Sequence, residues 1–140
     1  MKRLFLPFFI ATYLFALPAN ADHPFRGTFI EKDLGIRLVI DLYEESIDVP
    51  DMEMFGPLNG YACGSGLYRI WYVSKVVSCE EQNAVIHLSN DLGSETQTIE
   101  LTLQGDTALH FRQKGGSVMK KAVGKKLVKI QSEMTMMRQL

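Results

Sequence analysis

The sequence predicts a small all-β protein, an antiparallel up-and-down β-barrel of roughly seven to nine strands in a single domain. Several segments alternate apolar and polar residues with a period of two, and strand-like segments recur between short turns with no convincing helix between them. The 140 residues are 46% apolar and 22% charged, with a net charge of −1. This composition is typical of a globular chain and excludes a disordered one.

Residues 1–21 have the features of a secretory signal peptide. Met1-Lys2-Arg3 is charged, Leu4–Leu17 is largely apolar, and Pro18-Ala19-Asn20-Ala21 is a small-x-small cleavage site. The apolar run is shorter than the roughly 20 residues that a membrane-spanning helix needs. We therefore expect residues 22–140 to be an exported domain, periplasmic or secreted, without a transmembrane segment.

The first strands of this domain are expected at Gly27–Glu31, in a run from Ile36 to Tyr43, and, more weakly, at Ser46–Val49. The run from Ile36 has the clearest alternation, which predicts that one set of its side chains faces the core. That set is Ile36, Leu38, Ile40 and Leu42.

The stretch Pro50–Gly66 is the least regular, because glycines are interleaved with methionines and aromatic residues. We interpret it as a long, partly ordered loop. Both cysteines of the chain lie near or after it, and an even cysteine count in an exported protein predicts a disulfide, here Cys63–Cys79. Their spacing does not resemble a metal-ligand motif, so no metal site and no cofactor is expected.

Later strands are expected at Leu67–Val77, Ala84–Ser89, Gln97–Gln104 and Thr107–Gln113. In Gln97–Gln104, alternation places Ile99, Leu101 and Leu103 on the core side. Gly105-Asp106, which follows this strand, is expected to form a hairpin turn. Aromatic side chains are expected to fill the barrel interior or its mouth, namely Tyr61, Tyr68, Trp71, Tyr72 and Phe111.

Two interpretations fit residues 117–138. The apolar residues follow helical spacing from Met119 to Met137, but Gly124 interrupts that helix, and two short strands around Gly124-Lys125-Lys126 fit equally. Strands are favoured, because the glycines divide the segment at hairpin distances.

Charge is segregated along the domain. Residues 22–106 hold 5 basic and 15 acidic residues, whereas residues 107–140 hold 8 basic and 1 acidic residue. In a closed barrel the last strands pair with the first, so these charges are expected to compensate each other. The alternative is a basic face for an anionic partner.

No arrangement of residues resembles a catalytic site, so an enzyme is not expected. Ser65 lies in Cys63-Gly64-Ser65-Gly66, which lacks the first glycine of a nucleophile elbow. Nucleic-acid binding is disfavoured by the acidic balance of an exported domain.

The size, the strand pattern and two short features resemble the small lipocalin-like (calycin-type) barrels exported by bacteria. Lipocalins carry G-x-W on the first strand, packed against a late arginine, and Gly27-Thr28-Phe29 and Arg138 stand in those places. Phenylalanine replaces the tryptophan here. The resemblance implies the fold more than a ligand. The single expected disulfide, the size and the export are also similar to those of periplasmic lysozyme inhibitors, small barrels that plug an enzyme cleft with a loop.

Two non-enzymatic functions are therefore considered, of which the first is favoured and the second is the alternative. In the first, the barrel holds a small apolar or amphipathic ligand against inward-facing aromatics such as Tyr68 and Trp71. In the second, the loop Asp51–Gly66 contacts another exported protein, with Met54, Phe55 and Tyr61 at the interface.

Overall fold

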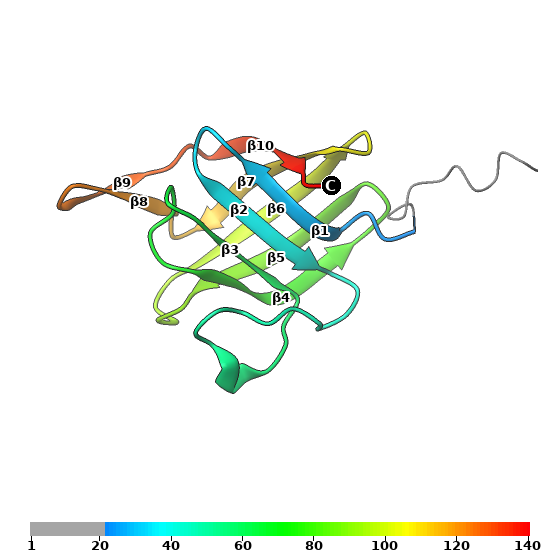
Figure 1. Cartoon of the computed structure of the whole chain (residues 1–140), viewed down its shortest axis with the longest axis horizontal. Coiled ribbons are helices and arrows are strands. Elements are labelled where there is room, and N and C mark those ends of the chain that lie inside the picture. The colour runs from blue at the N-terminus through cyan, green and yellow to red at the C-terminus, as the bar shows by residue number, and fades with distance from the viewer. Residues whose placement is uncertain (1–21) are drawn as a thin grey trace, which may run out of the picture.

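The computed structural model describes residues 22–140, so the predicted signal peptide, residues 1–21, lies outside the described residues. Eight antiparallel strands form a closed barrel in the order β1-β10-β7-β6-β5-β4-β3-β2 (Figure 1), which confirms the predicted fold. The barrel strands are β1 (Arg26–Glu31), β2 (Ile36–Asp41), β3 (Gly60–Cys63), β4 (Trp71–Cys79), β5 (Asn83–Asn90), β6 (Thr96–Gln104), β7 (Ala108–Gly116) and β10 (Glu133–Arg138).

The barrel interior holds one apolar cluster, to which every barrel strand contributes. The side chains predicted to face inward from β2 and β6, and Leu42 just beyond β2, are all buried, which confirms the period and the face of both strands. The largest fully buried side chains of the interior are Phe25, Phe29, Trp71 and Phe111. Side chains thus occupy the space in which a lipocalin-like ligand would lie.

Arg138 holds together the seam where the barrel closes, between β1 and β10. Its guanidinium lies over the Phe29 ring at 4.6 Å and donates hydrogen bonds to the backbone carbonyls of Pro24, Arg26 and Asp106 at 2.8–3.1 Å. Gly27 has φ +143°, and a Cβ there would lie 2.9 Å from the guanidinium. The residues on which the lipocalin resemblance rests therefore form the contact that this resemblance implies.

Residues 117–138 form strands, as favoured from the glycine positions. β8 (Lys120–Val123) and β9 (Lys126–Lys129) make a separate two-stranded sheet outside the barrel, and β10 returns to it. The turn between β8 and β9 contains Gly124 at φ +63°, a conformation that favours glycine.

Two expectations about the segment after β2 were wrong. Ser46–Val49 is not a strand and contributes only an isolated bridge between Ile47 and Leu58. Conversely, β3 lies within the stretch expected to be a loop, so the segment that crosses the outside of the barrel is residues 42–59. Most of β3 is buried on both faces, so it shows no alternating pattern.

The predicted Cys63–Cys79 disulfide is wrong, since both cysteines are free. Cys63 ends β3 at the edge next to the start of β4, because Ala62 pairs with Trp71, whereas Cys79 ends β4 at the far end of the barrel. The length of β4 separates the two residues by roughly 25 Å. A disulfide needs Cα atoms within about 7 Å.

We therefore expect two free thiols per chain. Alkylation of the unfolded protein without a reductant should add two labels, as measured by intact mass. In the native protein, burial raises the pKa of the Cys79 thiol, so labelling there should accelerate only in alkaline solution. A chain that takes up no label, and whose mass is two hydrogens below that of the reduced chain, would show that a disulfide is present and would contradict this.

Candidate functional site

The segment 42–59 leaves the barrel at Asp41, whose buried carboxylate fixes the first turn. It accepts hydrogen bonds from the backbone N–H groups of Tyr43 and Glu44 and from the Ser46 hydroxyl, and it pairs with Arg26 at 3.1 Å. Such bonds from an Asp to the next N–H groups turn the chain away from a strand. This is the physical reason why β2 ends here and why Ser46–Val49 does not continue in the sheet.

The same contacts determine the ionisation of Asp41. Burial by itself would raise the pKa of Asp41, but the hydrogen bonds from Ser46 and the backbone, together with the Arg26 guanidinium, hold it below its ordinary value. The ionised carboxylate therefore stabilises the fold at neutral pH. This contribution is lost as the pH falls through the lowered pKa.

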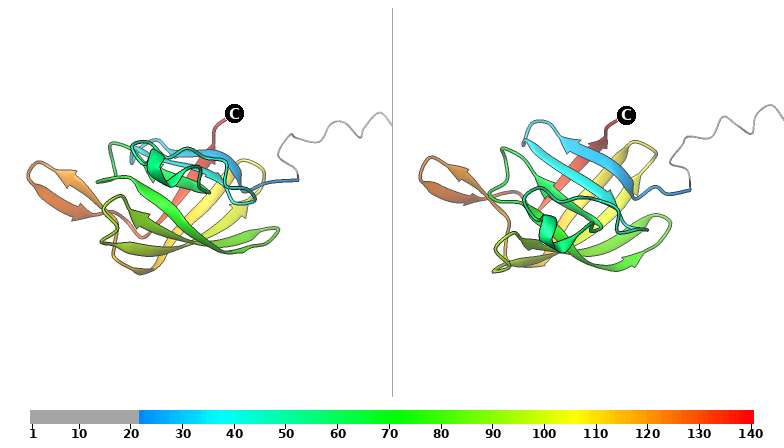
Figure 2. Two further views of the ribbon diagram at one scale, coloured as in Figure 1. Left: turned by 90° about the horizontal axis from the view of Figure 1, so that it is seen from below. Right: turned by 60° about the horizontal axis from the view of Figure 1, so that its bottom comes forward.

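The middle of the segment is fixed by a second apolar cluster on the outer face of the barrel wall. Val49 and Met52 are buried against Tyr61 of β3, and partly buried side chains from β2, β3, β4 and the segment itself surround them. Ile47 and Leu58 exchange two backbone hydrogen bonds of 2.8–2.9 Å, which close the base of the segment. The segment is thus an ordered cover on the wall rather than a loose loop (Figure 2).

The outermost part of this segment is a short 3-10 helix, η2 (Glu53–Phe55). Its side chains at Met54 and Phe55 are 86% and 56% exposed, although both are apolar. The Phe55 ring stacks on Tyr72 of β4 with 6.0 Å between the ring centroids, which limits its rotation. We call these two residues the Met54–Phe55 tip.

The five residues expected to bind a ligand or a partner lie in separate parts of the structure. Met54 and Phe55 form the tip, and Tyr61 lies beneath the same segment with 7% exposure. Trp71 is buried in the barrel interior, and its indole N–H donates to the carbonyl of Tyr68, whose own side chain is exposed at the end of the barrel. Of these five residues, Met54 and Phe55 are therefore the two that present apolar side chains on a fixed backbone away from the core.

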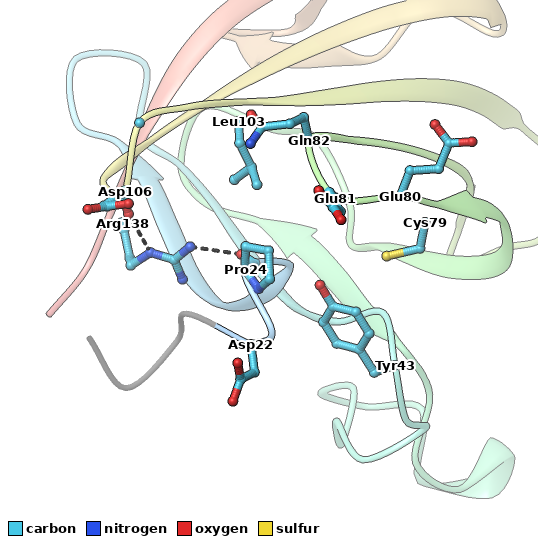
Figure 3. Close-up of a pocket in the computed structure, with 11 residues that line it drawn as sticks. Asp22, Pro24, Tyr43, Cys79, Glu80, Glu81, Gln82, Leu103, Asp106 and Arg138 are labelled. Carbon is cyan, nitrogen blue, oxygen red and sulfur yellow. Dashed lines mark hydrogen bonds between the residues drawn. The ribbon is translucent and has the colours of Figure 1, made fainter. Parts of the chain in front are cut away.

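A cavity of about 630 Å³ opens at the barrel end where β4 and β6 finish (Figure 3). Its lining is rich in carboxylates, from Asp22, Glu80, Glu81 and Asp106, and has few apolar side chains. Among residues 22–140, Arg138 is the one basic residue in the lining, and its guanidinium N–H groups already donate to backbone carbonyls.

A smaller cavity of about 180 Å³ lies at the opposite end, beside Tyr68, Trp71 and Leu127. Tyr68 and Trp71, the two aromatics expected to hold a ligand, therefore line this small cavity and not the larger one.

Comparisons of the chain with protein-family models, curated protein sequences and solved structures find no match. Within residues 22–140, no group of three or more His, Cys, Asp or Glu side chains is placed to hold a metal ion. No helix in the same range is long and apolar enough to cross a membrane.

Proposed function

We propose that the protein is an exported, non-enzymatic binding module that contacts a protein partner through the Met54–Phe55 tip. The observation that supports this most strongly is the contrast between the ordered base of the segment and its exposed apolar end. Methionine and phenylalanine are enriched in protein interfaces, and a side chain held in place before binding loses less entropy on association.

The structure supports the small-ligand alternative less well. Its favourable observation is the end cavity, whose volume lies in the range of small-molecule sites. However, its lining is acidic, so it suits a polar or cationic molecule better than the apolar one expected from the resemblance. The barrel interior is filled by the side chains of the apolar cluster.

The tip should be dispensable for folding. Replacing Met54 and Phe55 together by Ser should leave the midpoint of thermal unfolding nearly unchanged, because neither side chain belongs to an apolar cluster. Replacing Tyr61 by Ser should instead cost about 2 kcal/mol or more, because it empties the centre of the second cluster. A double variant that melts as early as the Tyr61 variant would contradict this arrangement.

Cross-linking tests the contact itself. A photoreactive amino acid at Phe55, in the protein expressed in its own host, should give a discrete covalent adduct with another polypeptide. The matched control is Leu92, which is equally exposed but lies in the turn between β5 and β6, at the end of the barrel beside the smaller cavity. Adducts from both positions alike, or from neither, would argue against the tip as the interface.

A further inference from the structure

The β8–β9 hairpin projects from the barrel (Figures 1 and 2) but is held firmly at its base. Met119 and Ile130, which flank it, are buried in the barrel core, and the N–H of Ile130 donates to the carbonyl of Met119 at 3.0 Å. On the other side, the N–H of Tyr68 donates to the carbonyl of Lys120 at 2.7 Å. The barrel therefore fixes the direction in which the hairpin points.

The hairpin carries most of the basic charge of the C-terminal region. Residues 120–129 contain five lysines and no acidic residue. Lys120 lies 4.0 Å from Glu95, whereas Lys121, Lys125, Lys126 and Lys129 make no ion pair with any of the described residues. The basic C-terminal residues were expected to pair with the acidic segments, but these four lysines have no acidic partner among the described residues.

Apolar side chains are interleaved with these lysines. Val123, Leu127 and Val128 are 41–51% exposed, and the register pairs Lys121 with Val128 and Val123 with Lys126. One face of the hairpin therefore presents two valines beside two lysines, away from the face on which Lys120 meets Glu95. Lys120 also lies directly opposite Lys129, and like charges in that position repel.

We propose that the β8–β9 hairpin docks on an anionic phospholipid surface. Its lysines would lie at the level of the lipid phosphates, and Val123 and Val128 would enter the boundary between headgroups and acyl chains. Lysine beside aliphatic residues is typical of segments that bind membrane surfaces.

The composition of the hairpin favours lipid over other anionic partners. Protein interfaces are depleted in lysine and enriched in aromatic residues and arginine, and residues 120–129 contain neither aromatic residues nor arginine. Single-stranded nucleic acid is bound by stacking on aromatic side chains, which the hairpin also lacks. This surface is separate from the Met54–Phe55 tip, whose Phe55 ring stacks on Tyr72 of β4.

Sedimentation with lipid vesicles tests the proposal, using the chain from residue 22. The protein should bind vesicles made of equal parts phosphatidylcholine and phosphatidylglycerol, and not vesicles of phosphatidylcholine alone, at an ionic strength of about 0.1 M. Changing Lys121, Lys125 and Lys126 to Gln should weaken binding about 100-fold, since each lysine near such a surface contributes about fivefold. Val123→Ser with Val128→Ser should weaken it about tenfold.

The matched control changes Lys32, Lys75 and Lys114 to Gln, which removes the same charge from three exposed positions outside the hairpin. This variant should bind like the wild type, and circular dichroism should show that all variants are folded. Equal loss in the control, equal binding to both vesicle types, or unchanged binding of the valine variant would overturn the proposal. So would tighter binding to DNA than to the mixed vesicles.

Discussion

Replacing Leu101 by Asp is expected to remove a large part of the free energy of unfolding. Leu101 lies in the middle of β6, fully buried between Ala84 and Phe111 of the neighbouring strands. A carboxylate there would be buried without a partner, at a cost of about 4 kcal/mol or more. That is a large part of the roughly 5–15 kcal/mol by which a domain is stable. Urea denaturation followed by circular dichroism measures the loss.

The control for this prediction is the next residue along the strand. Thr102→Asp places the same charge on the outer face, where the Thr102 hydroxyl lies 3.2 Å from the Asn83 side chain. Water can solvate a carboxylate there, so we expect a loss of about 1 kcal/mol or less. Similar losses at the two positions would mean that the inward face of β6 has been assigned incorrectly.

Replacing Arg138 by Met is expected to be the most damaging change that leaves the apolar core intact. Methionine preserves much of the contact with Phe29 but leaves the carbonyls of Pro24 and Arg26 without their donors. Charged hydrogen bonds of this kind contribute about 1.5–3 kcal/mol each, so the free energy of unfolding should fall by about 3 kcal/mol or more. Because β1 pairs with β10 over only a short register, the seam has little else to hold it.

Arg138→Lys should restore little of this stability, since an ammonium group lacks the planar fork that reaches several carbonyls at once. Arg112→Met is the matched control, because Arg112 pairs with Glu100 on the outer face of the barrel and is partly exposed. Surface ion pairs contribute about 0–1 kcal/mol. If the Arg112 and Arg138 variants lose the same stability in urea denaturation, the seam does not depend on Arg138.

The barrel was predictable because most of its strands have one face in the core. Such strands alternate, and the alternation in β2 and β6 identified the inward side chains correctly. β3 could not be found in this way, because the 42–59 segment covers its outer face and removes the alternation. It is recognised as a strand by its backbone pairing, with β2 over Gly60–Cys63 and with β4 at Tyr61 and Ala62.

The disulfide prediction failed for a different reason. It used the number of cysteines and the expected compartment, neither of which contains information about distance. A separation of 16 residues along the chain is short, but β4 runs the full length of the barrel between Cys63 and Cys79. The long strand predicted between the two cysteines is the feature of the sequence that argues against a disulfide, because an extended strand places them far apart.

The candidate site was predictable in part. The irregular composition of residues 51–66 correctly indicated an element outside the regular strands at Met54 and Phe55. It did not separate these exposed residues from Tyr61, which is buried below them, because the same residue types occur in cores and in interfaces. The anchor at Asp41 was missed, although an Asp at the end of an alternating run is a turn signal.

Native mass spectrometry of the protein purified from its own host tests the central proposal most directly. The proposal predicts a complex whose added mass is that of another polypeptide, and predicts that the Met54→Ser, Phe55→Ser variant purified in the same way is the bare chain. A bound small molecule retained by wild type and variant alike would contradict it. A wild-type protein found only as the bare chain would contradict it as well.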